Sequence, residues 1–260
     1  MKFITFILTL LLSSAALSEE SKEIIIAGDN WCPINCGEQD SKKGFMIDVA
    51  TEALKEAGYT VRYMEVPWLR AIEMAREGRI HAIVGAFKDD APDFYYPQVP
   101  FLQLSPNSLF MLKETEWQYQ NIRSFNGVRI GVIKGYDYGD EMNTYIKSFS
   151  YSKTSTLVQL SGNDAVERNL KFLTRGRIDV YVDAEPVFWY VANAMGISEK
   201  VKHVGSISSP EPCYIAFSPS KPESEALMLA LDKGVISLKQ QKRLAAIADK
   251  YALPKSSYQW

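Results

Sequence analysis

The motif GRI occurs twice in this chain, within GRIHAIVG (residues 78–85) and GRIDVYVD (residues 176–183). In each copy, apolar residues three and four apart come before the glycine, which is typical of one face of an amphipathic helix. The glycine supplies a helix stop, and the short apolar runs at residues 82–84 and 180–182 are typical of buried strands. The repeat therefore predicts two α/β halves of similar build, with a crevice between them.

The segments around each copy support this two-part organisation. In the first half, a strand at residues 24–27, a helix and a strand at residues 61–66 precede the repeated unit. This β-α-β-α-β order favours a parallel sheet with helices on its faces. The second half begins again with a strand at residues 128–132, so the chain is predicted to be an α/β protein of two lobes.

The boundaries of the lobes follow from the same pattern. We expect residues 19–110 to form the first part of lobe 1, residues 111–210 to form lobe 2, and residues 211–260 to return to lobe 1 with the C-terminal helices. The polar stretch at residues 113–120 is the expected site of the first crossing.

The N-terminus has the composition of a secretory signal peptide. Met1 and Lys2 form a short basic region, residues 3–12 are apolar, and small residues lead to Ser18 ahead of two glutamates. The apolar run is shorter than the roughly 20 residues that span a bilayer, although an N-terminal membrane anchor is the alternative interpretation. We therefore expect residues 1–18 to be removed and the protein to be exported to the periplasm.

The charge balance argues against two classes of partner. The chain has 29 basic and 31 acidic residues and a formal net charge of −2. So small an asymmetry favours neither nucleic acid nor an anionic membrane surface as a partner. With 47% hydrophobic residues and 12 prolines spread along the chain, no tract has the composition of a disordered segment.

Three cysteines in an exported protein allow one disulfide and leave one thiol over. Cys32 and Cys36 enclose a tight turn that could bring their sulfurs together in an oxidising compartment, and two reduced thiols in a loop are the equal alternative. Cys213 lies in an apolar strand pattern and is interpreted as a small core residue. Two cysteines and two distant histidines do not make a metal ligand set, so neither a metal nor a cofactor is expected.

Several segments, taken in order along the chain, resemble periplasmic solute-binding proteins of family 3, the polar-amino-acid type that serves ABC importers. The resemblance covers essentially all of the mature chain, and the ordered set is more specific than any single motif. It implies the type II periplasmic-binding fold, in which two α/β lobes joined by two hinge crossings close on a small ligand. The matching segments are residues 24–33, 44–48, 66–68, 78–85, 96–100, 130–135 and 176–183.

The ends of the predicted strands locate the ligand site. Ligands of open α/β sheets lie beyond the carboxyl ends of the strands, which selects the segments that follow each strand. The family resemblance points to the same segments. We expect ligand contacts from Asp29, Trp31, Trp68, Arg70, Gly85, Phe87, Lys88, Tyr136, Asp137 and Asp183.

Two tryptophans are the expected aromatic contacts. Trp68 aligns with the aromatic residue that stacks on the ligand in family members, and Trp31 aligns with another aromatic that lines the site. Either ring could cover an apolar or a cationic face of a ligand. The alternative is that each tryptophan packs between a helix and the sheet.

Charged residues indicate how the ends of a ligand could be held. Arg70 could clamp a carboxylate bidentately, or it could be a solvated helix charge. Asp183 aligns with the acid that receives the ligand's α-ammonium group in amino-acid binders, and it could also cap the helix that follows. The segment at residues 135–139 precedes a helix, so its backbone N–H groups could receive an anion, an arrangement that Asp137 opposes unless it caps the helix.

One departure from the family pattern concerns the ligand's carboxylate. Amino-acid binders of this family carry an arginine a few residues after the third strand, whereas residues 87–93 read FKDDAPD and contain none. Lys88 could replace the charge as a compact point donor, and Arg70 is the other candidate. The departure puts a standard α-amino acid in doubt and leaves the identity of the small polar ligand open.

Three functions are compatible with the resemblance. The leading hypothesis is a monomeric periplasmic binding protein that captures a small polar ligand and presents it to a membrane-embedded ABC permease. The second is a sensor that reports ligand occupancy to a membrane receptor. An enzyme, such as a dehydratase-like relative, is the least favoured, because neither His81 nor His203 lies near a predicted cleft end and the sequence contains no nucleophile motif. We assign no catalytic residue.

Overall fold

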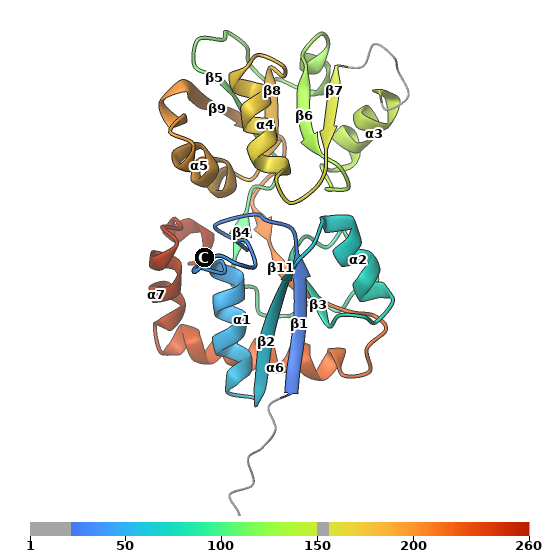
Figure 1. Ribbon diagram of the computed structural model, residues 1–260, viewed down its shortest axis with the longest axis vertical. Helices are drawn as coiled ribbons and strands as arrows, with labels where there is room; N and C mark the ends of the chain where they lie inside the picture. Colours follow the sequence, from blue (N-terminus) through green and yellow to red (C-terminus); the bar gives the residue numbers. More distant parts are fainter. Residues whose placement is uncertain (1–21, 150–155, 260) are drawn as a thin grey trace, which may run out of the picture.

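The computed structural model describes residues 22–149 and 156–259, which form two α/β lobes stacked one above the other (Figure 1). The signal peptide expected at residues 1–18 lies outside the described residues. Within the described part of the chain, no helix is long and apolar enough to cross a membrane. The fold class expected from the sequence, two α/β lobes joined by two crossings, is confirmed.

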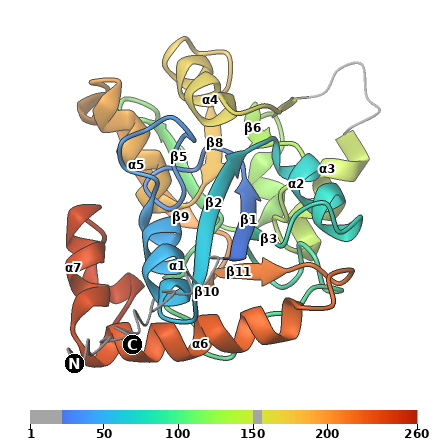
Figure 2. The ribbon, with the colours of Figure 1, turned by 60° about the horizontal axis from the view of Figure 1, so that its bottom comes forward.

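The first lobe is built on a four-stranded sheet of order β11-β3-β1-β2, in which β11 runs antiparallel to β3 and the other pairs are parallel. Figure 2 shows α6 running across this lobe beside α1 and α7. The elements of the lobe are β1 (Lys22–Gly28), α1 (Phe45–Lys55), β2 (Tyr59–Glu65), α2 (Trp68–Arg76), β3 (Ala82–Ala86), β11 (Tyr214–Phe217), α6 (Ser224–Gln240) and α7 (Arg243–Lys250).

Alternation along β1 explains why helices cover both faces of this sheet. Ile24 and Ile26 pack into the core that contains α1, whereas Ala27 packs into the separate cluster around α2. Successive side chains of a strand point to opposite faces, so a strand that is apolar at nearly every position has to be covered on both sides. The helices occupy the faces, and the ends of the strands are left for a site.

The second lobe repeats this build on a five-stranded sheet of order β7-β6-β8-β5-β9. Strands β7, β6 and β8 are parallel, and β5 runs antiparallel between β8 and β9. Strand β9 was not expected, because its sequence VKHVGS lacks the alternation of polar and apolar residues that is typical of a half-buried strand. The elements are β5 (Ser108–Leu112), β6 (Ile130–Ile133), α3 (Asp140–Phe149), β7 (Leu157–Leu160), α4 (Ala165–Thr174), β8 (Val180–Asp183), α5 (Glu185–Ala194) and β9 (Val201–Ser206).

The two copies of the GRI motif end equivalent helices. Gly78 follows α2 with a φ of 69°, and Gly176 follows α4 with a φ of 62°. Glycine has no Cβ that would clash in this left-handed conformation. In each copy the glycine N–H and the next N–H donate to carbonyls of the last helical turn, at 3.0 and 2.8 Å in the first and at 3.1 and 2.8 Å in the second. The predicted helix–turn–strand repeat is confirmed.

A short antiparallel ribbon connects the lobes (Figure 1): β4 (Gln103–Leu104) pairs with β10 (Glu211–Pro212). Strand β5 already belongs to the second sheet, because it pairs on both sides with strands of that lobe. The crossing expected at residues 113–120, and the lobe boundary after residue 110, are therefore corrected to the stretch between β4 and β5. An apolar extended run fits the last strand of one sheet as well as a central strand of the next, and its pairing partners are remote in the sequence.

The loop after β1 is closed by a disulfide bond between Cys32 and Cys36, so the first of the two alternatives is confirmed. Cys213 is a free and fully buried thiol, as expected. Within the bridged loop, Trp31 N–H donates to Asn35 O at 2.8 Å. The closed loop thereby fixes the backbone of Trp31 just beyond the end of β1.

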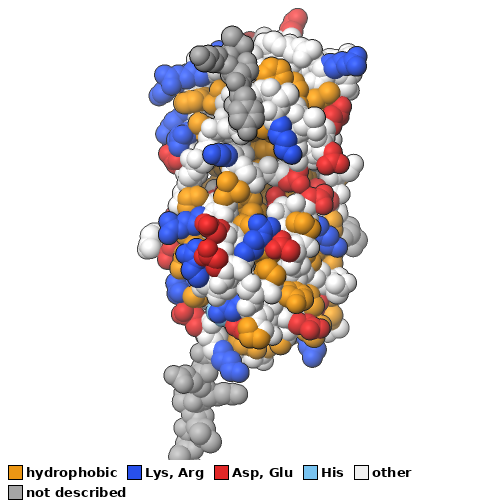
Figure 3. Space-filling model, turned by 90° about the vertical axis from the view of Figure 1, so that its right-hand side faces the viewer, with side chains coloured by type: hydrophobic (Ala, Val, Ile, Leu, Met, Phe, Trp, Pro, Cys, Tyr) orange, Lys and Arg blue, Asp and Glu red, His pale blue; other side chains and the backbone are white. Residues whose placement is uncertain are grey.

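Charges of both signs are mixed on the side of the molecule that carries α2 and α3. Figure 3 shows Lys, Arg, Asp and Glu side chains interspersed over both lobes on that face. Positive and negative side chains are therefore balanced on this face, as they are in the whole chain. The face presents no broad basic surface.

Candidate ligand-binding site

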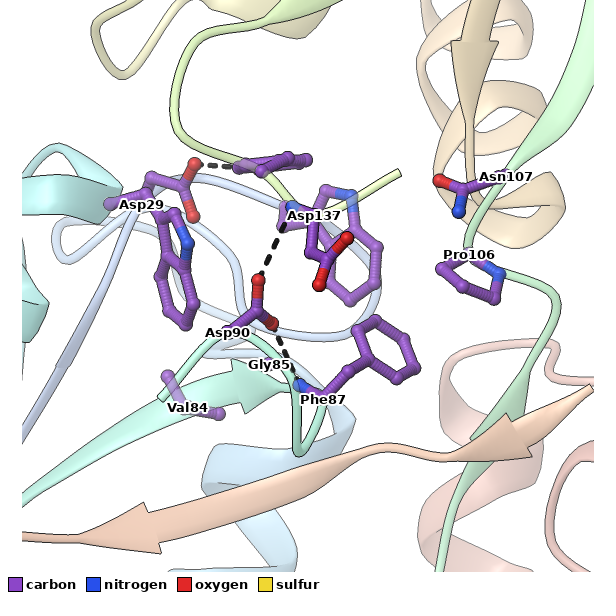
Figure 4. Close-up of a pocket in the computed structure, with 11 residues that line it drawn as sticks. Asp29, Val84, Gly85, Phe87, Asp90, Pro106, Asn107 and Asp137 are labelled. Atoms are coloured by element: carbon purple, nitrogen blue, oxygen red, sulfur yellow. Dashed lines mark hydrogen bonds between the residues drawn. The ribbon is translucent and has the colours of Figure 1, made fainter. Parts of the chain in front are cut away.

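A small cavity lies between the two lobes (Figure 4). Its volume is about 20 Å³, which is enough for roughly one water molecule. The lobes are closed on each other around this cavity, since hydrogen bonds join Tyr136 to Asp29 and Trp31 to Asp183. The first lobe contributes Asp29, Trp31, Trp68, Val84, Gly85, Phe87 and Asp90 to the lining, and the second lobe with the hinge contributes Pro106, Asn107, Tyr136 and Asp137.

Four aromatic side chains line this cavity, and apart from Phe87 they come from three separate segments of the chain. Trp31 comes from the disulfide loop, Trp68 from the first turn of α2, and Tyr136 from the turn after β6. The Tyr136 ring stands nearly perpendicular to both indoles, at 84° to Trp31 and 81° to Trp68, with centroids 6.4 and 6.3 Å apart. Such edge-to-face contacts stabilise aromatic pairs, and here they join opposite lobes.

Two side-chain hydrogen bonds also join the lobes. The Tyr136 hydroxyl donates to Asp29 Oδ2 at 2.6 Å, and Trp31 Nε1 donates to Asp183 Oδ1 at 2.8 Å. Each bond has its aromatic donor on one lobe and its carboxylate on the other. Hydrogen bonds to ionised groups are roughly twice as strong as neutral ones, so these pairs stabilise the closed arrangement.

Asp90 makes a third connection between the lobes, through the backbone. Its Oδ2 accepts the N–H of Phe87 at 2.8 Å within its own loop, and its Oδ1 accepts the N–H of Asp137 at 3.3 Å from the other lobe. Figure 4 shows the carboxylate of Asp90 between these two residues. Both backbone donors at this point are thus taken by a carboxylate of the chain itself.

Burial raises the pKa values of the aspartates in and behind the cavity. Loss of solvent raises the pKa of Asp29 to about 6, and the hydrogen bond from Tyr136 offsets only part of this. The pKa of Asp183 is raised to about 6 by the same cause, against hydrogen bonds that lower it. Burial, with the neighbouring charge of Asp137, raises the pKa of Asp90 to about 7. The closed cleft therefore holds several carboxyl groups that water does not solvate.

The sequence of residues 24–254 matches the family model of the bacterial extracellular solute-binding proteins, family 3. The chain belongs to this family. The match covers almost all of the described residues, including both lobes and the hinge ribbon. Direct comparison with curated protein sequences gives no significant match.

Solved structures of similar proteins share the fold over most of both chains. An ancestral arginine-binding protein bound to arginine is 19% identical with a TM-score of 0.70, and covers 88% of this chain and 97% of its own. A substrate-binding protein of an ABC uptake transporter from Streptococcus pneumoniae with bound histidine is 17% identical with a TM-score of 0.71, covering 88% and 92%. A histidine kinase sensor domain similar to periplasmic binding proteins is also 17% identical with a TM-score of 0.71, covering 88% and 95%. At these identities the similarity establishes the fold.

In this family 3 protein, most of the residues singled out from the sequence meet at the cavity. Trp31 and Trp68 are 4% and 5% exposed, and Trp68 also packs into the apolar cluster around α2. Trp68 thus lines the cavity and also packs into the core as the alternative stated, and its expected contact with a ligand stays a prediction. The expected residues that line the cavity are Asp29, Trp31, Trp68, Gly85, Phe87, Tyr136 and Asp137.

The structure does not bring Arg70, Lys88 or Asp183 to the cavity wall. Arg70 lines an outer groove of about 940 Å³, which adjoins the cavity because Asp29, Trp68 and Asp90 line both. Lys88 is exposed, with its ammonium group 5.7 Å from the centroid of the Tyr214 ring.

Asp183 is buried behind Trp31 and its carboxylate is occupied by protein donors. Besides the indole N–H, it accepts the hydroxyl of Tyr181 and the backbone N–H of Ala184 at 2.7 Å. The last of these bonds lies before α5, whose N-cap is Ala184 and has no side-chain cap hydrogen bond, so the helix-capping alternative for Asp183 is wrong. Asp183 supports an aromatic wall from behind.

Asp137 bonds within the turn that precedes α3, which changes the interpretation of residues 135–139. Its Oδ1 accepts the backbone N–H of Gly139 at 2.7 Å and Nδ2 of Asn143 at 2.6 Å. The N–H of Tyr138 donates to Asn143 Oδ1 at 3.1 Å. The backbone N–H groups of residues 136–139, which could have received an anion here, are bonded within the protein.

Sequence reasoning missed Val84, Asp90, Pro106 and Asn107 as lining residues. Asp90 belongs to the segment after β3 that the strand-end rule selects, and a carboxylate three residues after Phe87 is placed to turn back onto its N–H. Pro106 and Asn107 were hidden by the misplaced crossing. Among the described residues, no group of three or more His, Cys, Asp or Glu side chains is arranged to hold a metal ion.

Proposed function

We propose that this protein binds a small polar ligand between its two lobes and presents it to a membrane-embedded ABC permease. The ligand class is an amino acid or a related amine or carboxylate. The observation that carries the proposal is the cavity, whose walls come from both lobes. A ligand in contact with both lobes favours the closed form, and a permease can then recognise that form.

The proposed contacts divide by chemistry. Trp31, Trp68 and Tyr136 offer ring faces, while Asp29 and Asp90 offer carboxylate oxygens. Asp183 acts through Trp31, which it orients by the hydrogen bond at 2.8 Å. Gly85, Phe87 and Asp137 complete the lining. Arg70 and Lys88, which do not line the cavity, are proposed to lie at the rim, where they meet an incoming ligand before closure.

We also propose that the protein works as a monomer in the periplasm, after export directed by residues 1–18. Membership of an extracellular solute-binding family supports this location. We propose no catalytic activity. The two histidines support this, because His81 Nδ1 accepts the backbone N–H of Ile25 at 3.0 Å and His203 lies on β9, so that neither lines the cavity.

A thermal-shift panel of amino acids, amines, small peptides and carboxylates tests the proposal. At least one compound should stabilise the protein, and Trp68→Ala should abolish that shift. Trp117→Ala is the matched control, because Trp117 stacks on Phe125 in the second lobe away from the cavity and its loss should leave the shift intact. If no compound stabilises the protein and a substrate is turned over instead, the binding function is wrong.

A sensor role is the second candidate, and the similarity to a histidine kinase sensor domain favours it. The two roles differ in what happens to the ligand. Deleting the gene should abolish uptake of the ligand if the partner is an importer. If uptake persists and a transcriptional response to the ligand is lost, the sensor role replaces the transport role.

A further inference from the structure

The lining of the cavity is acidic and carries no basic side chain. Asp29, Asp90 and Asp137 contribute carboxylates to it, and Asp183 lies immediately behind Trp31. Among the described residues that line the cavity, none is Lys, Arg or His. A carboxylate on a ligand would therefore meet like charges in a space with little water to screen them.

The backbone donors that could have compensated a ligand carboxylate are already used. Asp90 accepts the N–H groups of Phe87 and Asp137, one from each lobe (Figure 4). Paired backbone N–H groups in turns are a common way to bind an anion in proteins. Here the carboxylate of Asp90 accepts these two N–H groups. The carboxylate of a zwitterionic ligand therefore finds these donors occupied.

The aromatic walls suit a cation. The ring of Tyr136 is nearly perpendicular to those of Trp31 and Trp68, so that three rings surround the cavity on different sides. Cages of this kind, in which a cation lies within about 6 Å of the ring centroids, recognise organic ammonium groups. The Tyr136 hydroxyl now occupies Asp29 Oδ2, which an ammonium group could replace as the donor.

The indole N–H of Trp68 is an uncharged hydrogen-bond donor on a residue that lines the cavity. It is buried without a hydrogen-bond partner among the described residues. A hydroxyl or ether oxygen of a ligand could accept from it. One uncharged N–H does not balance the charge of a carboxylate against three aspartates, so it does not restore an amino-acid site.

We propose that the ligand of this cleft is a small organic ammonium compound that carries no carboxylate. The inference rests on the proposed binding function and narrows its ligand class from polar molecules in general to amines and quaternary ammonium compounds. The cavity of about 20 Å³ has room for roughly one water molecule, so the lobes have to part to admit this ligand. The ring cage and Asp29 then hold the cation, and Asp90 excludes the carboxylate of the corresponding amino acid by occupying its donors and repelling its charge.

Matched pairs of compounds test this inference directly. Agmatine, histamine and cadaverine are arginine, histidine and lysine without the carboxylate, and choline serves as a quaternary ammonium probe. Titration calorimetry at pH 7.5 should give at least one amine that binds about tenfold or more tightly than its parent amino acid, since like-charge juxtaposition is strongly disfavoured at a buried site. Choline should compete with that amine.

The possible results distinguish failure of the ammonium-ligand inference from failure of the proposed binding function. If the parent amino acids bind as tightly as their amines, or more tightly, the inference is wrong and the binding function stands. If none of the amines or choline binds but a carboxylate or an amino acid does, the conclusion is the same. If no compound of the wider panel binds at all, both the inference and the proposed function fail.

Asp90→Ala examines the excluding role of this residue. The change frees two N–H groups and removes one charge, so it should weaken amine binding and shift the amine-to-amino-acid affinity ratio about tenfold or more toward the amino acid. Asp89→Ala is the matched control, because Asp89 is an exposed neighbour outside the cavity lining. If Asp90→Ala does not fold, Asp90→Asn should shift the ratio in the same direction. A ratio that neither Asp90 variant changes, or that Asp89→Ala changes equally, contradicts the proposal.

Discussion

Replacing Tyr136 with phenylalanine should open the cleft of the ligand-free protein. The change removes the hydroxyl that donates to Asp29 across the cavity at 2.6 Å and leaves the ring contacts with the two tryptophans in place. A hydrogen bond to a charged group contributes about 1.5–3 kcal/mol. Because about 1.4 kcal/mol is a factor of ten, the equilibrium between closed and open forms should move toward the open form roughly 10- to 150-fold.

Small-angle X-ray scattering measures this shift as an increase in the radius of gyration. Tyr138→Phe is the matched control, because the Tyr138 hydroxyl accepts the N–H of Ile133 at 2.7 Å within the second lobe. That variant should have a lower free energy of unfolding than the wild type, and its radius of gyration should remain that of the closed protein. The reasoning is refuted if wild-type protein and Tyr136→Phe scatter identically, or if Tyr138→Phe opens the molecule to the same extent.

Three further changes have defined outcomes. Trp68→Ala should weaken ligand binding at least tenfold in calorimetry, because a buried aromatic wall is lost; unchanged affinity would place the ligand elsewhere. The closed protein binds more protons than the unfolded chain between about pH 4 and 7, since burial raises the pKa of Asp29 from 3.8 to about 6 and that of Asp90 to about 7. Its free energy of unfolding should therefore rise as the pH falls through this window. A carboxyl group whose pKa is raised by about two units contributes roughly 3 kcal/mol to this rise. Chemical denaturation should show a smaller rise for Asp90→Asn. Reduction should add two daltons to the protein at Cys32 and Cys36 and should lower ligand affinity by freeing the Trp31 loop, whereas unaltered affinity would make the bridge irrelevant to the site.

The fold was predictable to the extent that burial leaves a local pattern. The strand at residues 24–27 and the two helix ends at Gly78 and Gly176 are visible because periodicity and glycine stops are properties of neighbouring residues. Residues 108–112 show the limit, since nothing in an apolar run says which sheet it joins. Its assignment needed the partners β8 and β9, which follow far along the chain.

The sequence predicted which segments meet at the candidate site better than it predicted which side chains line the cavity. The strand-end rule found the segments that meet at the cavity, because parallel strands end at one edge of a sheet. It could not tell that Arg70 lines the adjoining groove and not the cavity, or that Asp183 lies behind Trp31, because these depend on how the two lobes meet. The role of Asp90 depends on a hydrogen bond from Asp137 in the opposite lobe, and no local pattern records it.

A co-crystal structure with the tightest-binding amine of the panel tests the central claim most directly. The account expects the ligand between the lobes, with its ammonium group within about 6 Å of the ring centroids of Trp31 and Trp68 and in contact with Asp29. Asp90 should keep its bonds to the two backbone N–H groups. A ligand bound in the outer groove beside Arg70, or one whose carboxylate displaces Asp90, would contradict the account.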